Sequence, residues 1–160
     1  MFVFEEVLNL VAMISPYNDA YFMKQALDEA KKAYLLDEVP VGAVIVCQNQ
    51  IIARGHNLTE TLCDVTAHAE IQAITAAANY LGAKYLKGCT LYVTLEPCCM
   101  CAGALYWSQI DKVVYGARDL KRGAGKHGNE LYHPSSLVVN GILEEDCAQL
   151  MKDFFYEKRK

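Results

Sequence analysis

Four residues in two short segments have the types and the spacing that could bind a metal ion and move protons. The first segment holds His68 and Glu70, and the second holds Cys98 and Cys101. The two cysteines are three residues apart, so on a helix they share a face and their thiolates could bind one ion. Two soft thiolates and one imidazole suit Zn²⁺. We therefore predict His68, Cys98 and Cys101 as zinc ligands, with Glu70 as the proton carrier.

Helix geometry indicates where the ion lies. Pro97 suits a first helical turn, so the cysteine pair is expected at a helix N-terminus, whose partial positive charge favours thiolates. His68 and Glu70 are about 200° apart around a helix, so both cannot lie on one side of it. Both can reach an ion beyond the helix end if His68 lies in the first turn. The spacing thus predicts a metal site where two helix N-termini converge.

Three protein ligands would leave the fourth zinc position for water, as in a catalytic site, whereas a structural zinc usually has four protein ligands. Candidates for a fourth ligand are Cys99, His56 and His127. Zinc lowers the pKa of bound water toward about 7, and Glu70 could take the released proton and pass it to a reacting group. A zinc-stabilised RNA-binding module without catalysis is the alternative of a different class, and it predicts a closed four-ligand site.

The hydrophobic periodicity predicts the elements that hold these residues. Helices are expected where apolar residues recur every three or four positions, and strands where short apolar runs are bounded by turn residues. These rules predict a helix near 20–34 capped by Asp19, strands at 41–47 and 51–54, a helix at 67–81, a strand at 90–95, a helix at 97–107, strands at 112–115 and 137–139, and a helix at 144–158. The order predicts an α/β domain of three layers, α/β/α, with a central mixed sheet and helices on both faces.

The composition is that of one globular domain. The chain has 160 residues, of which 53% are hydrophobic and 21% charged. No apolar run approaches the length of a membrane helix, roughly 18 residues. Residues 1–18 are interpreted as an N-terminal extension, with Met13 as an alternative initiator, because they lack the positive start of a secretory signal. Residues 19–160 are interpreted as a single domain that holds the zinc ligands. Seven cysteines, an odd count at uneven spacing, are not typical of a disulfide framework, so we expect a reducing, cytoplasmic compartment.

Positive charge gathers in two segments, although the net charge is −4. Residues 112–128 contain Lys112, Arg118, Lys121, Arg122 and Lys126 against a single acid. Residues 152–160 contain four basic and two acidic residues. A local basic footprint fits a nucleic-acid phosphate backbone. A solvated loop and a solvated helix end explain the same charges, and that alternative stays open here.

His-x-Glu followed by Pro-Cys-x-x-Cys is the signature of the zinc-dependent nucleobase deaminases. Over about residues 20–158 the chain resembles bacterial tRNA-specific adenosine deaminases, within the cytidine/deoxycytidylate deaminase superfamily. The segments that carry the resemblance are Val39–Val44, Thr66–Glu70, Val93–Cys98, Met100–Ala104, Tyr115–Asp119 and Gly141–Leu143. The resemblance implies a cytidine-deaminase-like fold, zinc at the three residues named above, a homodimer, and conversion of adenosine to inosine at the wobble position of a tRNA anticodon loop.

The same resemblance implies that Asn57 hydrogen-bonds the target base and that Asp119 lies near the sugar of a neighbouring nucleotide. Each of these residues also has a purely structural interpretation. Asn57 would be a turn residue, and Asp119 a loop residue paired with Arg118 or Lys121. Phe154 and Phe155 would be core residues. Relatives usually have proline where this chain has Val65, and residues 121–136 match poorly. The nearest rival function is a deaminase of a free base or nucleoside, of the guanine or cytosine type.

Overall fold

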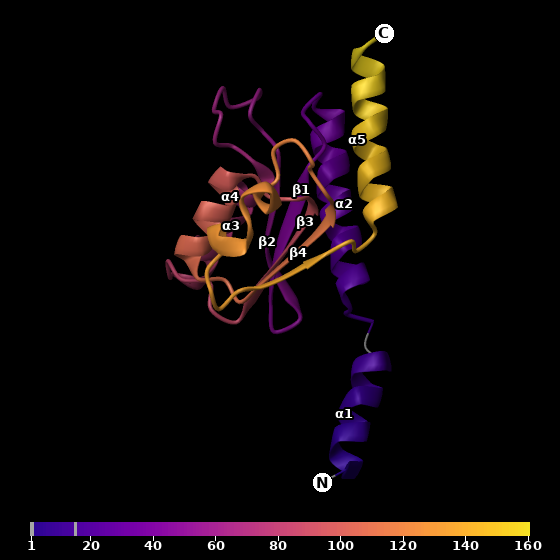
Figure 1. Ribbon diagram of the computed structural model, residues 1–160, viewed down its shortest axis with the longest axis vertical. Coiled ribbons are helices and arrows are strands. Elements are labelled where there is room, and N and C mark those ends of the chain that lie inside the picture. Colours follow the sequence, from indigo (N-terminus) through magenta and orange to yellow (C-terminus); the bar gives the residue numbers. More distant parts are fainter. Residues whose placement is uncertain (1, 15) are drawn as a thin grey trace.

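The structure is a computed structural model that describes residues 2–14 and 16–160. Helix α1 (Phe2–Ile14) stands apart from the sheet and the other helices (Figure 1). Met1 and Ser15 fall outside the described residues, so the extension that we predicted over residues 1–18 is described only in part. None of the helices within the described ranges is long and apolar enough to cross a membrane.

The centre of the molecule is a five-stranded sheet in the order β2-β1-β3-β4-β5. Strand β1 pairs antiparallel with β2 and β3, whereas β3, β4 and β5 run parallel. The predicted mixed sheet is therefore confirmed. The strands are β1 (Gly42–Cys47), β2 (Gln50–His56), β3 (Cys89–Leu95), β4 (Lys112–Ala117) and β5 (Leu137–Asn140).

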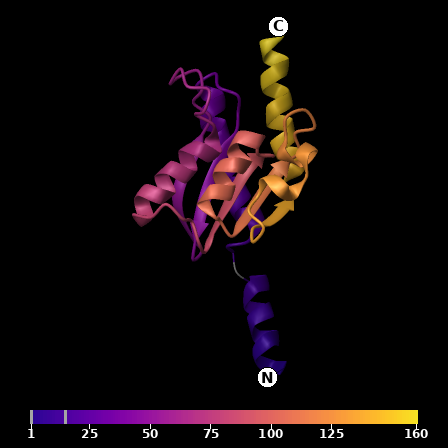
Figure 2. The same ribbon diagram turned by 60° about the vertical axis from the view of Figure 1, so that its left-hand side comes forward.

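Helices cover both faces of this sheet, as predicted. α2 (Asp19–Leu35) and α5 (Glu144–Lys158) pack on one face, and α3 (Ala69–Leu81) and α4 (Cys99–Ser108) lie side by side on the other (Figures 1 and 2). Strand β1 contributes side chains to the hydrophobic cores on both faces of the sheet, because successive side chains of a strand point to opposite faces. Val44 joins the α2 side and its neighbour Ile45 joins the α3 side, and both are fully buried.

Several element boundaries differ by one or two residues from the prediction. The N-cap of α2 is Asn18, whose Oδ1 accepts a hydrogen bond from the Tyr21 N–H (2.8 Å), so the predicted cap at Asp19 was wrong. Asp19 instead accepts hydrogen bonds from the Tyr92 hydroxyl (2.7 Å) and from the Lys112 ammonium (3.1 Å). Asp19 has this long-range role because the start of α2 lies against β3 and β4.

One end of the sheet gathers the chain segments that carry the predicted chemistry. Gly42 opposes His56 in the register of β1 and β2, and Leu95 opposes Ala117 in that of β3 and β4. The segments that precede β1 and follow β2, β3 and β4 therefore meet at the same edge. Between β4 and β5 the chain forms a long loop with two short 3₁₀ helices, η1 (Ala124–His127) and η2 (Asn129–Leu131).

Candidate functional site

Two helix N-termini bring together the three predicted metal ligands. His68 is the N-cap of α3, Cys98 is the N-cap of α4, and Cys101 lies in the first turn of α4. Their ligand atoms all lie within 4.8 Å of one another. The expected convergence of two helix ends is therefore present, although His68 caps its helix instead of lying in the first turn. Neither cap side chain bonds its own helix, so both face the shared site.

The donor spacing fits Zn²⁺. Zn–S bonds of about 2.3 Å and a Zn–N bond of about 2.0–2.1 Å at tetrahedral angles place N and S about 3.6 Å apart. The distance from His68 Nδ1 to Cys101 Sγ is 3.5 Å, and that to Cys98 Sγ is 3.7 Å. The chemistry of the donors also fits, since thiolate and imidazole are the usual zinc ligands.

No fourth protein ligand joins this group among residues 2–14 and 16–160. Of the three candidates, Cys99 is exposed, and His56 contacts the buried carboxylate of Glu29 through its Nδ1 (3.1 Å). His127 belongs to η1 and is likewise exposed. A tetrahedral ion held by the three grouped donors would keep one open position, which is the arrangement of a catalytic zinc site.

The site favours one thiolate even without an ion. The Cys101 thiol beside it lowers the pKa of Cys98 to about 4, with His68 assisting. The contact with Cys98 in turn raises the pKa of His68. A thiolate is the form that binds metal, so this pairing prepares one ligand for the ion.

Glu70 lies in the first turn of α3 and is only 4% exposed. Burial raises the pKa of its carboxyl to about 7, because removal from water disfavours the charged form. The side chain also interacts with Cys101, so it lies at the metal group. A carboxyl with such a pKa can both accept and release a proton near neutral pH, as the sequence-based role requires.

A cleft of about 990 Å³ opens above this group. His68, Glu70 and Cys98 line it, together with the predicted substrate-binding residues Asn57 and Asp119. The structure thus brings to one cavity the proposed catalytic residue, two proposed ligands and both residues taken from the resemblance, while Cys101 is buried behind them. The other lining residues are Val39, Val41, Thr59, Ala69, Leu95, Glu96, Ala117, Arg118, Leu120, Lys121, Arg122, Ala148, Met151, Lys152, Phe155, Lys158 and Arg159.

The two basic segments, far apart in sequence, meet at this cleft. The loop after β4 contributes Arg118, Lys121 and Arg122, and α5 with its end contributes Lys152, Lys158 and Arg159. Lys112 does not belong to this group, because it pairs with Asp19 at the other end of the sheet. Packing of α5 against β4 explains the convergence, which charge counting along the sequence could not establish.

Two buried carboxylates that the sequence reasoning did not single out hold the walls of the cleft. Glu38, before β1, accepts hydrogen bonds from residues 57–61, which include Asn57. Glu96, after β3, accepts from the backbone N–H groups of Asp119 (3.0 Å) and Gly125 (2.8 Å). In the sequence, Glu38 directly precedes the Val39–Val44 segment and Glu96 directly precedes Pro97, and these positions could have drawn attention to them. A sequence does not reveal, however, which N–H groups an acidic residue contacts.

The environments of Asp119 and Phe155 differ from those expected if each had only a structural role. Asp119 Oδ1 accepts from the backbone N–H groups of Lys121 and Arg122 (both 3.0 Å), so it shapes the loop instead of pairing with a basic side chain. Phe154 is buried as expected, but Phe155 is 43% exposed and lines the cleft, so the core assignment of Phe155 was wrong.

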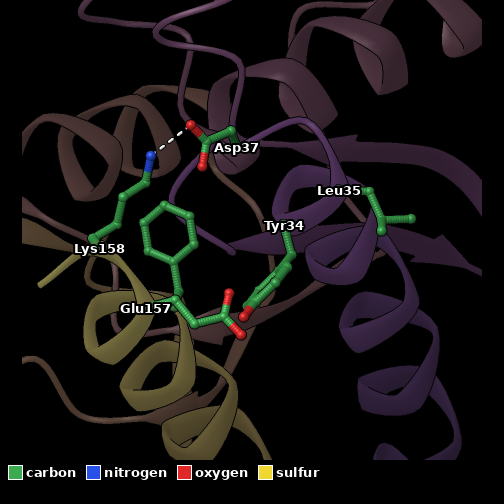
Figure 3. A pocket seen from close by; sticks show the side chains of 6 residues that line it. Tyr34, Leu35, Asp37, Glu157 and Lys158 are labelled. Carbon is green, nitrogen blue, oxygen red and sulfur yellow. Dashed lines mark hydrogen bonds and ion pairs between the residues drawn. The ribbon is translucent and has the colours of Figure 1, made fainter. Parts of the chain in front are cut away.

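A second pocket, of about 470 Å³, lies between the ends of α2 and α5. Figure 3 shows Lys158 reaching Asp37 and the Tyr34 hydroxyl turned toward Glu157. The hydrogen bond with Glu157 raises the pKa of Tyr34 to about 12. These contacts join α2 to the end of α5, and Lys158 lines both this pocket and the cleft.

Comparison with known proteins gives consistent matches. The family model of the cytidine and deoxycytidylate deaminase zinc-binding region matches residues 16–117. The tRNA-specific adenosine deaminase of Bacillus subtilis (strain 168) is 50% identical over 147 residues, which cover 89% of this chain and 91% of that protein. The tRNA-specific adenosine deaminase of Aquifex aeolicus (strain VF5) is 56% identical over 143 residues, covering 87% and 95%.

Solved structures show the same fold. A structure from a study of A-to-I editing by tRNA:A34 deaminases matches with a TM-score of 0.77 and 44% identity, over 81% of this chain and 98% of that one. A guanine deaminase from Bacillus subtilis matches with a TM-score of 0.62 and 42% identity, over 69% and 70%. The expected cytidine-deaminase-like fold is thereby confirmed.

Proposed function

The chain belongs to the cytidine and deoxycytidylate deaminase family. From that premise we propose that it converts adenosine to inosine by hydrolytic deamination at the wobble position of a tRNA anticodon. The relatives named tRNA-specific adenosine deaminases support this substrate. The observation that carries it is the cleft, in which a buried glutamate and the His/Cys/Cys group lie below six basic side chains from two distant segments. A phosphate backbone is the partner that such a rim suits.

We assign one Zn²⁺ per subunit to His68, Cys98 and Cys101. The ion would supply Lewis acidity that makes water a nucleophile near neutral pH. The chain holds these donors on the caps and first turns of two packed helices, so their spacing is set before the ion binds. The buried position of Cys101 keeps bulk water from one side of the group.

Glu70 is proposed to move the protons. Its carboxylate takes a proton from the attacking water, and the protonated carboxyl then delivers it to the ring nitrogen next to the amino-bearing carbon. Glu70 then takes the proton of the new hydroxyl on that carbon and passes it to the amino group; the carbonyl forms, the C–N bond breaks and ammonia leaves. Because burial places the pKa of this carboxyl at about 7, neither protonation state is strongly disfavoured at neutral pH.

Asn57 and Asp119 are proposed to bind the substrate. Asn57 lines the same cleft as Glu70, and there it would hydrogen-bond the target base. Asp119 also lines the cleft, and its backbone N–H donates to Glu96; its carboxylate would lie near the sugar of a neighbouring nucleotide.

The substrate is tested by incubating the zinc-loaded protein with a tRNA panel, free adenosine, guanine and cytidine, while inosine and ammonia are measured. We expect inosine only in a tRNA that carries adenosine at the wobble position. Release of ammonia from guanine alone would overturn the tRNA assignment and favour the free-base deaminase, which the guanine deaminase neighbour makes the second candidate.

We further propose a cytoplasmic homodimer in which residues 19–160 are the deaminase domain and residues 1–18 an extension. Seven free cysteines support a reducing compartment, and a 77% exposed Trp107 on α4 supports a face that a second copy covers. The separation of α1 from the sheet supports the domain limits (Figure 1). Sedimentation tests the dimer, and a monomer would contradict it. Cell fractionation tests the compartment, and a membrane or secreted fraction would contradict it. A chain lacking residues 1–18 tests the domain limits, and an inactive shortened chain would contradict them.

A further inference from the structure

We propose that Glu38 is a positioning residue that fixes the orientation of the Asn57 side-chain amide in the cleft. The proposal rests on the proposed function, since it assumes that Asn57 meets the target base. Glu38 lies in the segment between α2 and β1, and its side chain is fully buried. It does not touch the metal group.

The burial of Glu38 is unusual because no counterion accompanies it. Among the described residues, no Lys, Arg or His forms an ion pair with its carboxylate. A buried carboxylate without a cation is costly unless hydrogen bonds replace its hydration. Burial alone would raise the pKa of Glu38, but hydrogen bonds from Thr61, Glu60 and Thr59 outweigh it and lower the pKa. The group is therefore a carboxylate at neutral pH, and only an acceptor.

Every donor to Glu38 lies in residues 57–61, of which Asn57 and Thr59 line the cleft. Oε1 accepts from the Thr61 N–H (2.7 Å). Oε2 accepts from the Glu60 N–H (3.2 Å), the Thr59 hydroxyl (3.4 Å) and the Asn57 Nδ2 (3.4 Å). One buried side chain thus ties residues 57–61 to the segment that leads into β1.

The contacts of Asn57 show why its amide has a single orientation. Nδ2 donates to Glu38 Oε2 and to the Val39 carbonyl (3.3 Å), while Oδ1 accepts from the Thr59 N–H (3.4 Å). A flipped amide would place Oδ1 against two acceptors and Nδ2 against a donor. An ionised Glu38 cannot donate, so it opposes that flip together with the Val39 carbonyl and the Thr59 N–H. The orientation decides which polar atom Asn57 offers to the base, so Glu38 acts on base recognition through Asn57.

Glu38→Gln tests this role, because glutamine keeps the shape but can donate to a flipped Asn57. We expect kcat/KM for tRNA to fall about tenfold to a hundredfold, while the zinc content and the Kd for tRNA stay unchanged. Glu29→Gln is the matched control: Glu29 is 2% exposed on α2 but lies outside the cleft. It should lower Tm and leave kcat/KM within about twofold of wild type.

A double-mutant cycle separates positioning from a structural role. In an Asn57→Ala background, Glu38→Gln should not lower kcat/KM further, because the amide that it positions is gone. An equal loss in both backgrounds, or no loss in wild type, would overturn the proposal. If the Gln variant is too unstable to purify, Glu38→Asp enters the same cycle with the same expectation, since it moves the carboxylate by one methylene. Wild-type protein that deaminates no tRNA would instead refute the proposed function, so the two failures are distinguishable.

Discussion

Neutralising Lys121 and Arg122 should flatten the salt dependence of tRNA binding. Both side chains are exposed on the loop after β4 and line the cleft. Their backbone N–H groups donate to Asp119 Oδ1, and Gln substitutions keep those bonds. Lys121→Gln with Arg122→Gln therefore removes two charges and leaves the loop conformation supported.

The size of the effect follows from the charges that line the cleft. Each phosphate contact to a single strand contributes about −0.7 to the slope of log K against log salt. If all six basic side chains of the cleft contact phosphates, the wild-type slope is about −4 and that of the double variant about −3. Between 50 and 200 mM salt, affinity should then fall about 300-fold for wild type and about 50-fold for the variant.

The assay is fluorescence anisotropy of a labelled anticodon stem-loop that carries guanosine at the wobble position, so that turnover does not occur. The matched control is Lys31→Gln with Lys84→Gln, which changes the net charge equally at two exposed sites outside the cleft. Its slope should equal that of wild type. An unchanged slope in the Lys121 and Arg122 variant would show that these side chains are only solvated and would refute the reasoning.

Three further predictions concern the site and its support. Glu70→Ala should keep zinc and tRNA binding but reduce turnover at least about a hundredfold in a single-turnover assay; retained activity would contradict its proton role. Gly55→Ala should lower the free energy of unfolding by about 1–3 kcal/mol in urea melts, because its Cβ would lie 2.5 Å from the Ala69 carbonyl oxygen at the start of α3. Gly103→Ala is the control, since its Cβ meets open space in α4 and should leave stability unchanged or improved. The pKa of Glu38 is lower in the folded than in the unfolded protein, so its carboxylate stabilises the fold above about pH 4.3 and this stabilisation is lost as the pH falls. The free energies of unfolding of wild type and Glu38→Gln should therefore converge at low pH. A difference that stays constant with pH would contradict this.

The sequence alone determined the chemistry of the centre and the class of the fold. The His-x-Glu and Pro-Cys-x-x-Cys spacings reflect local helix-end geometry, which short segments specify by themselves. The apolar periodicity likewise predicted the five strands and helices α2 to α5 to within one or two residues, because each must bury one face. It did not predict α1, which stands apart from the sheet. The boundaries that differed, such as the cap at Asn18, depend on which neighbouring polar side chain finds a distant partner.

Only the tertiary structure decided which residues share the cleft. Glu38 and Asn57 are 19 residues apart, and the basic loop and tail are separated by β5, so no local pattern could pair them. Strand register and the packing of α5 on β4 set those distances, and hydrogen bonding in a buried environment gives Glu38 and Glu96 their roles. Metal ligands are recognisable in a sequence because the ion demands particular atoms. Supporting carboxylates are not, because any acidic residue can serve and only its surroundings select it.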